Sequence, residues 1–374
     1  MRIGIDCRLW KESGVGRYTR NLVSELSKLD TKNQYILFFK SKEFKEVALS
    51  GKNFEKRLAD IPWHSFVEQR QFAPLLDKEN LDLIHFPYIS VPLNYKKPFV
   101  MTIHDLILFH YQTAQASTLP FPIYNLKLLG YKHVVSQAAK NAKKIITVSN
   151  FSKKDIMDQL RIDPDKIVVT YEGSLQNEKT KKQTQKENYF LYVGNAYPHK
   201  NLELLVQAFS KVVLEQPETA KKPIVNPIVK LVFVGKDDMF YKGLKEKVKD
   251  LNIEKSVEFK NDVTDEELLK LYQNSLAFIT PSKMEGFGLG VLEAITNNCF
   301  VIASDIPTFH EICEEAALYF DPMSVDDLVD KMKLVLYGNT FQDKIELGFQ
   351  RAKEFSWKKM AEQTLQVYQQ VLEK

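Results

Sequence analysis

Two glutamates, Glu285 and Glu293, bracket a glycine-containing turn in the second half of the sequence. The apolar run 275–280 before them predicts a buried strand, and the apolar spacing of 289–295 predicts a helix. The first amide groups of such a helix have no partner within it and, with the helix dipole, form a site for phosphate. A carboxylate before this site and another just after it fit a ligand with hydroxyl groups on both sides of a phosphate. A nucleoside diphosphate sugar has this layout.

Each residue of this motif also has a purely structural explanation. Glycines after a strand commonly form a tight turn, and a glutamate near a helix start complements the helix dipole. Because either explanation suffices for a single residue, the motif indicates a function only together with the rest of the chain.

Length and composition indicate a globular protein of two domains. The chain has 374 residues, more than one hydrophobic core usually supports, with 44% hydrophobic and 27% charged residues. A net charge of +4 without a basic stripe favours a small anionic ligand or a membrane surface over nucleic acid. The three cysteines have no metal-type spacing, and no signal peptide or membrane-spanning run is recognisable. We therefore expect a cytoplasmic protein, soluble or peripheral at a membrane.

Strand-like and helix-like segments alternate along the chain, which is typical of a parallel sheet covered on both faces. The pattern starts again at residue 189, after a polar segment without apolar residues. This predicts an α/β protein with two doubly wound, Rossmann-like domains facing each other across a cleft. The predicted boundaries are 1–176 for the first domain, 177–188 for the linker and 189–354 for the second domain.

A second glycine turn follows the first predicted strand and contains Gly14, Gly16 and Arg17. Amide groups in such a turn point toward the strand ends, where open α/β sheets bind ligands. A dinucleotide-dependent oxidoreductase is disfavoured, because the spacing is not G-x-G-x-x-G and the segment from Asp6 to Gly14 is too long for that tight turn.

Two further side chains could act on a ligand. His104 stands near the end of the predicted strand 98–105, where an imidazole could bind sugar hydroxyls or assist a leaving group as a cation; a hydrogen-bonded turn residue is the alternative. For His85, near the end of another strand, we prefer the structural explanation. Lys200 stands at a helix start, where a cation opposes the dipole, so diphosphate binding is favoured over simple solvation.

The region 106–154 contains seven lysines and no acidic residue, with aromatic residues between the lysines. Such a run forms either a surface that faces a membrane or phosphate groups, or the solvated face of a helix. The solvated face is the commoner outcome, and peripheral membrane contact is the alternative.

Several ordered motifs resemble those of the family-4 retaining glycosyltransferases of the GT-B fold, the group 1 enzymes that include bacterial mannosyltransferases. The resemblance covers almost the whole chain, and Glu285 and Glu293 meet the E-x7-E pattern of that family. The other motifs are G-V-G-R-Y from Gly14, T-I-H-D-L from Thr102, I-T-V-S from Ile146, Y-V-G from Tyr192 and P-H-K-N-L from Pro198. The final segment 355–374 also resembles the closing helix of the family, which packs back on the first domain.

The resemblance implies roles for the matching residues. Glu285 would bind hydroxyls of the donor sugar, Glu293 those of the ribose, and His104 would lie beside the sugar. Catalytic roles would fall to Glu285, His104 and Lys200. Donor binding would further involve Gly14, Gly16, Arg17, Gly194, Asn195, Phe287, Gly288 and Leu289.

The resemblance also implies a hexosyltransferase that keeps the anomeric configuration. It needs no metal or other cofactor, because cationic side chains and helix amides can stabilise the departing diphosphate. The donor is a nucleoside diphosphate sugar, with GDP-mannose favoured, and the acceptor is a hydroxyl of a glycan or lipid-linked molecule, as in polysaccharide or glycolipid biosynthesis. The alternatives are a GT-B epimerase or phosphorylase and a non-catalytic nucleotide-sugar-binding module.

Two residues depart from the pattern of the family. Asn195 stands where an arginine is frequent, which leaves one cation fewer for the diphosphate. Gly290 stands where proline is common, and glycine is expected to loosen the first turn of the helix.

Overall fold

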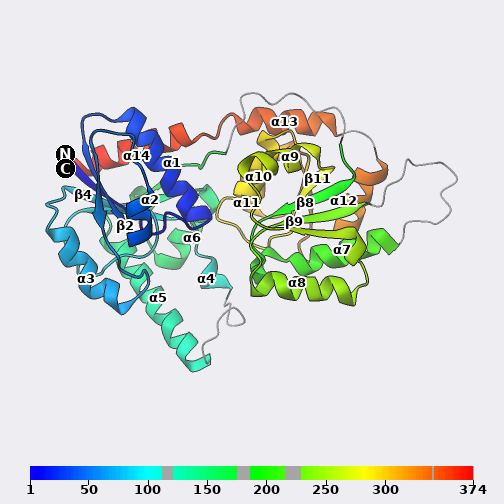
Figure 1. Cartoon of the computed structure of the whole chain (residues 1–374), viewed down its shortest axis with the longest axis horizontal. Coiled ribbons are helices and arrows are strands. Elements are labelled where there is room, and N and C mark those ends of the chain that lie inside the picture. Colours follow the sequence, from blue (N-terminus) through cyan, green and yellow to red (C-terminus); the bar gives the residue numbers. More distant parts are fainter. Residues whose placement is uncertain (112–120, 175–185, 215–228, 339–340, 374) are drawn as a thin grey trace. The chain divides into compact units, whose positions relative to one another are not determined.

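The computed structural model describes residues 1–111, 121–174, 186–214, 229–338 and 341–373 (Figure 1). The chain forms two compact units, the first made of Met1–Gly173 with Ser356–Lys374 and the second of Ser174–Phe355. The predicted linker 177–188 lies mostly within residues 175–185, outside the described residues.

The first unit is built on a parallel sheet of seven strands in the order β3-β2-β1-β4-β5-β6-β7. The strands are β1 (Arg2–Asp6), β2 (Gln34–Phe39), β3 (Phe54–Leu58), β4 (Leu83–Phe86), β5 (Phe99–Ile103), β6 (Lys144–Thr147) and β7 (Ile167–Val169). The chain runs outward from β1 to β3 and then returns to pair β4 with β1, so the strand order reverses between these two strands. Open α/β sheets bind ligands beyond the carboxyl ends of the strands at such a reversal.

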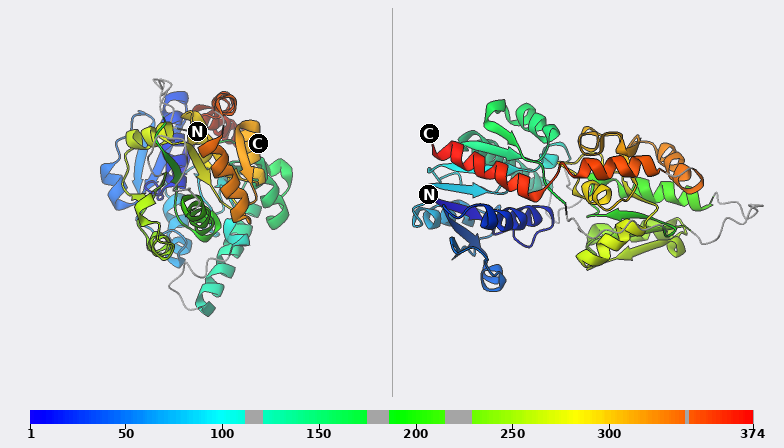
Figure 2. Two further views of the ribbon diagram at one scale, coloured as in Figure 1. Left: turned by 90° about the vertical axis from the view of Figure 1, so that its right-hand side faces the viewer. Right: turned by 90° about the horizontal axis from the view of Figure 1, so that it is seen from above.

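The helices of the first unit include the last one in the chain. They are α1 (Gly14–Leu29), α2 (Ser41–Glu46), α3 (Phe66–Asp77), α4 (Ile107–His110), α5 (Phe121–Asn141), α6 (Asn150–Leu160) and α14 (Trp357–Leu372). At the start of helix α14, the hydroxyl of Ser356 accepts a hydrogen bond from the amide of Lys359 at 3.1 Å. Helix α14 lies beside α1 (Figure 2). The two ends of the sequence therefore build one unit.

The second unit is built on a parallel sheet of six strands in the order β10-β9-β8-β11-β12-β13. The strands are β8 (Tyr189–Val193), β9 (Lys230–Val234), β10 (Val257–Lys260), β11 (Ala277–Thr280), β12 (Val301–Ser304) and β13 (Ala317–Phe320). The helices are α7 (Leu202–Leu214), α8 (Met239–Asp250), α9 (Asp265–Asn274), α10 (Leu289–Thr296), α11 (Pro307–Cys313), α12 (Val325–Tyr337) and α13 (Gln342–Ala352). Here the strand order reverses between β8 and β11, which pair directly.

The central strands are apolar because they are covered on both faces. Every residue of β4, β5, β11 and β12 is buried, which requires an almost continuous apolar run instead of an alternating one. Each unit has its own large hydrophobic core. The prediction of two doubly wound parallel α/β domains is thereby confirmed.

Candidate active site

The loops that follow β8 and β11 are joined by an ion pair and a backbone hydrogen bond. Lys200 ends the short 3-10 turn Pro198–Lys200 after β8, and Glu285 lies in the loop after β11. The ammonium of Lys200 donates to both carboxylate oxygens of Glu285, at 2.7 and 2.8 Å. The amide of Lys283 donates to the carbonyl of His199 at 2.8 Å. The reversal of strand order thus brings together two residues that the sequence placed in separate motifs.

Glu285 is held by two hydroxyl groups that the sequence analysis did not identify. The hydroxyl of Ser282 donates to its carboxylate at 2.7 Å, and that of Thr308 donates to its backbone carbonyl at 2.8 Å. Burial acts to raise the pKa of Glu285, but the charges of Lys200 and His199 and the hydrogen bonds from Lys200 and Ser282 lower it overall. The carboxylate is therefore ionised at neutral pH and can accept hydrogen bonds from a ligand.

Helix α10 begins four residues after Glu285. Gly288 is the N-cap residue and has a φ of 97°, and a Cβ there would lie 2.9 Å from the ring of Phe309. The helix begins at Leu289 and has no acidic residue in its first turn, so its dipole favours an anion at this end. The ring of Phe287 is buried and packs edge-on against Phe355, with centroids 5.9 Å apart. The ring of Phe287 is therefore part of the packing of the second unit.

Glu293 lies one turn inside α10 and is only 4% exposed. The hydroxyl of Tyr272 donates to its carboxylate at 3.1 Å. This second acid of the motif is thus set deeper than Glu285, and Tyr272 is a further contact that the sequence analysis missed.

The loop after β8 contains Gly194 and Asn195, whose carbonyls are both fixed by tyrosines. The hydroxyl of Tyr241 donates to the carbonyl of Gly194, and that of Tyr192 to the carbonyl of Asn195, each at 2.7 Å. The side-chain oxygen of Asn195 accepts the amide of Tyr197 at 3.4 Å. An asparagine here supports the local turn, a task that an arginine could not perform.

The second departure from the family pattern, Gly290, lies beside a buried ring. A Cβ at this position would lie 3.0 Å from Cζ of Phe278, whose side chain is 1% exposed. The ring therefore occupies the space that a larger residue would need. Helix α10 nevertheless includes Gly290 from its first turn onward.

In the first unit, His104 follows β5 and both of its ring nitrogens face acceptors. Nδ1 lies 3.2 Å from the carboxylate of Glu172, and Nε2 lies 3.0 Å from the carbonyl of Pro87. Burial acts to lower the pKa of His104, but the hydrogen bond and charge of Glu172 and the bond to Pro87 raise it overall. Two acceptors facing the two ring nitrogens favour the doubly protonated form of the imidazole, which donates from both. Glu172 could have been noticed in the sequence as an acid just after a predicted strand.

The glycine turn of the first unit is already helical. Helix α1 begins at Gly14, so the predicted turn is its first turn, and hydrogen-bonded turns lie instead in the segment before it. A Cβ on Gly16 would lie 2.7 and 2.6 Å from the carbonyl oxygens of Leu9 and Trp10, whereas nothing lies within 4 Å of one on Gly14. Gly16 is thus needed for close packing.

The same turn is connected to His104 through Tyr18. Arg17 is half-buried, and the buried ring of Tyr18, the next residue, lies edge-on to the imidazole of His104 with centroids 4.8 Å apart. Gly14, Gly16, Arg17 and His104 therefore gather at one end of the first unit, while the other predicted site residues belong to the second.

His85 is a structural residue, as predicted. Its Nδ1 lies 2.6 Å from the hydroxyl of Tyr368 in α14, and its Nε2 lies 2.8 Å from the hydroxyl of Thr102 in β5. Burial and the charge of His104 lower its pKa to about 3, so the ring is neutral. This contact fixes the C-terminal helix to the sheet of the first unit.

Comparison with models of known protein families assigns the chain to a family. Residues 173–347 match the model of glycosyl transferases group 1, and residues 13–173 match that of glycosyltransferase family 4. The chain is a family-4, group 1 glycosyltransferase. The predicted family and enzyme class are thereby confirmed. In the described part of this glycosyltransferase, no group of three or more His, Cys, Asp or Glu side chains is placed to hold a metal ion.

Two similar proteins are O-antigen mannosyltransferases by name. O-antigen chain mannosyltransferase RfbU from Salmonella typhimurium is 29% identical over 275 residues, covering 73% of this chain and 70% of that protein. O-antigen chain mannosyltransferase B from Escherichia coli is 26% identical over 313 residues, covering 80% and 77%.

Solved structures share the fold at low sequence identity. Sucrose-phosphate synthase from Thermosynechococcus elongatus superimposes with a TM-score of 0.78 and 18% identity, covering 99% of both chains. WaaG, a glycosyltransferase involved in lipopolysaccharide biosynthesis, gives a TM-score of 0.73 and 15% identity, covering 98% of this chain and 99% of that one. The predicted GT-B architecture is thereby confirmed.

Proposed function

We propose that this glycosyltransferase moves a hexose, with mannose favoured, from a nucleoside diphosphate sugar to a hydroxyl of a glycan or lipid-linked acceptor. The observation that carries the proposal is the Lys200–Glu285 pair, fixed at the reversal of strand order beside the start of α10. The names of the mannosyltransferase relatives support mannose. A structural neighbour from Anabaena, HepE, was crystallised with UDP-glucose, which supports a sugar nucleotide as donor.

We assign the parts of the donor to the parts of the second unit. The diphosphate is bound by the ammonium of Lys200 and by the first amides of α10 around Gly288 and Leu289. Glu285, ionised and oriented by Ser282, accepts hydroxyls of the sugar. Glu293 takes the ribose hydroxyls, which requires the ribose to reach the deeper position of that carboxylate.

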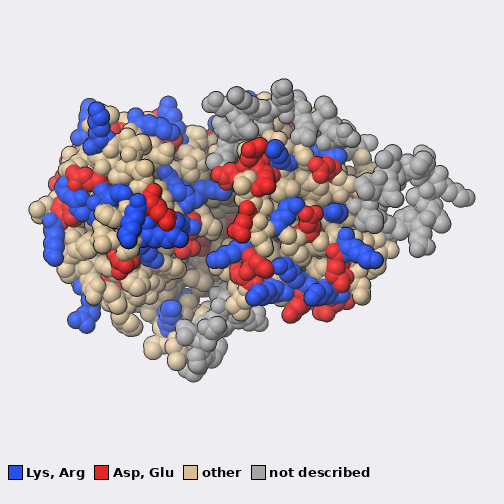
Figure 3. All heavy atoms as spheres, viewed as in Figure 1, with Lys and Arg blue, Asp and Glu red and all other residues tan. Residues whose placement is uncertain are grey.

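On the face of the molecule drawn in Figure 3, acidic and basic side chains of the described residues are intermingled within each unit. A mixed surface of this kind differs from the one-signed stripe of a nucleic-acid-binding protein. We therefore locate the binding of anionic groups at the Lys200 site, as expected for a small anionic ligand.

We propose that transfer retains the anomeric configuration and needs no metal. The acceptor hydroxyl attacks from the face that the diphosphate leaves, and a diphosphate oxygen takes the proton. Lys200 and the amides of α10 stabilise the charge that develops on the diphosphate. A double displacement would need a carboxylate at the anomeric carbon. Glu285 is already engaged by Lys200 and Ser282, so we assign it to hydroxyl binding instead.

We assign an electrostatic role to His104. Its two ring nitrogens face Glu172 and Pro87, so the contribution that we assign to it is a positive charge at the end of β5, and not the donation of a proton. Replacing Glu172 by glutamine should lower the pKa of His104, which ¹⁵N NMR titration of the ring would detect.

A panel of nucleotide sugars tests the proposed reaction. The protein is incubated with GDP-mannose, UDP-glucose, UDP-galactose and UDP-N-acetylglucosamine, with and without candidate glycan and lipid-linked acceptors. Proton NMR then reports the anomeric configuration of any product. A retained configuration with at least one donor is expected. An inverted product would refute the mechanism, and failure to hydrolyse or transfer from any donor would refute the proposed function.

We further propose contact with an anionic membrane surface through the 106–154 region. Helix α5 exposes Ile123, Leu126 and Leu129 by 53%, 72% and 65%, at a spacing of three residues that keeps them on one side of the helix. Lys127 is exposed between them. Among the described residues, no helix has the length and apolar character needed to cross a bilayer. Apolar side chains flanked by lysines instead suit insertion into the headgroup layer.

Vesicle sedimentation tests this contact. The triple variant Ile123→Ser, Leu126→Ser, Leu129→Ser should lose binding to vesicles with anionic lipid, while Leu347→Ser, a leucine of the second unit that is 52% exposed, should not. Unchanged binding of the triple variant would refute the proposal.

A further inference from the structure

Three aromatic side chains of the first unit surround His64, and we call these four residues the His64 cluster. The imidazole lies 5.1 Å from the ring of Trp63, 5.4 Å from that of Tyr88 and 5.5 Å from that of Tyr131, measured between centroids. Trp63 also meets Tyr88 edge-on at 6.4 Å. These residues come from three parts of the chain: the loop after β3, the loop after β4, and α5.

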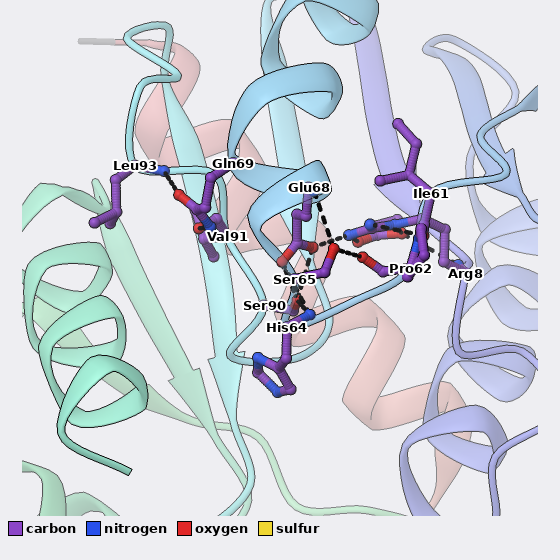
Figure 4. A network of polar contacts seen from close by, with 11 residues as sticks. Arg8, Ile61, Pro62, His64, Ser65, Glu68, Gln69, Ser90, Val91 and Leu93 are labelled. Carbon is purple, nitrogen blue, oxygen red and sulfur yellow. Dashed lines mark hydrogen bonds and ion pairs between the residues drawn. The ribbon is translucent and has the colours of Figure 1, made fainter. Parts of the chain in front are cut away.

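The loop that carries His64 is fixed by a buried polar network (Figure 4). The amide of His64 donates to the carboxylate of Glu68 and to the hydroxyl of Ser90, each at 3.1 Å. The carboxylate of Glu68 in turn accepts a hydrogen bond from the guanidinium of Arg8 at 2.6 Å, and Arg8 also forms an ion pair with Asp6 at 2.6 Å. The side chains of Arg8 and Glu68 are each 1% exposed. A buried charged network of this kind is weak evidence for stability but holds its members in one geometry.

What the network holds in place is an unusual conformation of His64. Its φ is 53°, in the left-handed region that a residue with a side chain rarely adopts. Figure 4 shows the imidazole pointing away from the carboxylate of Glu68, toward the other side of the loop. Backbone strain that the surrounding structure enforces is found mostly at ligand-binding and active sites.

The imidazole of His64 has unused hydrogen-bonding capacity. Its Nε2 is buried, and within the described residues it has no hydrogen-bond partner. Burial, with the charges of Arg8 and Lys127, lowers the pKa of His64 to about 4, so the ring is neutral at physiological pH. A buried polar atom without a partner is unfavourable unless a ligand supplies one. A hydroxyl group would suit Nε2 in either tautomer, because it can both donate and accept.

The His64 cluster lies next to the end of β5 that carries His104. Tyr88 directly follows Pro87, whose carbonyl accepts the proton of His104 Nε2 at 3.0 Å. Trp63 is 37% exposed, so part of its ring can be reached from solvent. The charge of Arg8 is balanced by Asp6 and Glu68, so the network adds no free cation that would favour a phosphate.

We propose that the His64 cluster is the subsite for one hexopyranose unit of the acceptor. The aromatic rings contact the apolar face of the sugar, and His64 Nε2 exchanges a hydrogen bond with one of its hydroxyls, an arrangement of apolar walls and few polar groups that is usual for small-molecule sites. The proposal rests on the proposed function, since it names the acceptor side of the same reaction. A neutral sugar fits a cluster that presents neutral rings better than an anionic donor would.

The test measures binding and transfer separately on the full-length protein. Saturation-transfer-difference NMR is recorded with the methyl α-glycosides of mannose, glucose and galactose as probes. The variants are His64→Ala and Trp63→Ala, and the matched control is His133→Ala, which removes an exposed histidine of α5. The same proteins are assayed for hydrolysis of the preferred nucleotide sugar and for transfer to the best glycoside.

We expect at least one glycoside to bind the wild type and the control, and the two cluster variants to weaken it about tenfold, as for the loss of one hydrogen bond or ring contact. Donor hydrolysis should stay within about twofold of the wild type. The proposal is overturned if no glycoside binds the wild type, if both variants bind like the control, or if both lose donor hydrolysis as well. If the wild type binds a glycoside through His64 but uses no nucleotide sugar, the proposed function fails while the sugar subsite stands.

Discussion

Replacing Glu285 by glutamine removes one negative charge and keeps the shape of the side chain. The wild-type carboxylate accepts two hydrogen bonds from Lys200, at 2.7 and 2.8 Å, and one from Ser282, at 2.7 Å. Breaking a buried ion pair costs about 3–5 kcal/mol and breaking an exposed one about 0–1 kcal/mol. Because the side chains of Lys200 and Glu285 are 18% and 12% exposed, we place the loss of unfolding free energy between these limits, at about 2 kcal/mol. In a unit of this size that lowers Tm by about 4–8 °C.

The effect of this substitution should depend on pH in a defined direction. Although burial opposes ionisation, the pKa of Glu285 in the folded protein is below its ordinary value of 4.5. A carboxyl group with a lowered folded pKa stabilises the protein above its unfolded pKa and loses that contribution as pH falls through the folded pKa. The difference in Tm between wild type and variant should therefore be constant near neutral pH and should shrink below 4.5.

Activity gives the second measurement on the same variant. A hydrogen bond to a charged acceptor contributes about 1.5–3 kcal/mol, so kcat/KM for transfer should fall about 10- to 100-fold. The control is Glu266→Gln on α9, whose carboxylate is 80% exposed and pairs with Lys270 at 2.8 Å; both Tm and activity should be unchanged. Full activity of Glu285→Gln with every donor, or a difference in Tm that widens on acidification, would refute the reasoning.

Three further outcomes are expected. Gly288→Ala forces a side chain onto a φ of 97° and places its Cβ 2.9 Å from the ring of Phe309, so the free energy of unfolding should fall by about 1–3 kcal/mol in urea titrations, whereas Gly243→Ala, in open space on α8, should not lower it. Tyr368→Phe removes the hydroxyl that lies 2.6 Å from Nδ1 of the buried His85 and should lower the unfolding free energy of the first unit by about 1–2 kcal/mol; an unchanged urea midpoint would show that this bond does not stabilise α14. Transfer should survive dialysis against EDTA within about twofold, because the proposed mechanism assigns the diphosphate charge to Lys200 and helix amides, and a loss restored by a divalent cation would contradict this.

The pattern of strands and helices in the sequence predicts the fold, and through the fold it also predicts that the loops carrying Lys200 and Glu285 lie close together. Continuous apolar runs identify strands covered on both faces, and their alternation with helices limits the sheet to a doubly wound order. In such an order the loops after β8 and β11 lie at the reversal, so residues there must come close. The proximity of Lys200 and Glu285 follows from the topology, although the direct ion pair between their side chains does not.

Contacts that depend on side-chain packing could not be predicted. Glu172 meets His104 because β7 and β5 flank β6, and no local pattern marks an acid after a short strand as the partner of a histidine. The spacing of Gly16 predicts a ligand-binding turn, whereas the structure shows that a side chain there would collide with the backbone of the preceding loop. Periodicity reports which face of an element is buried, but it does not report which atoms meet.

The pairing of Lys200 with Glu285 has a consequence for how a donor would enter. Each group is assigned to a different part of the donor, yet the two side chains form an ion pair with each other at 2.7 Å. A diphosphate that draws the ammonium of Lys200 toward itself would leave the ionised carboxylate of Glu285 short of donors in a place where it is only 12% exposed. Hydroxyl groups of the attached sugar would replace the hydrogen bonds that the carboxylate loses from Lys200. Under the proposed assignment the ion pair would link the two halves of donor recognition, because binding of a diphosphate at Lys200 would be most favourable when a sugar reaches Glu285 in the same event.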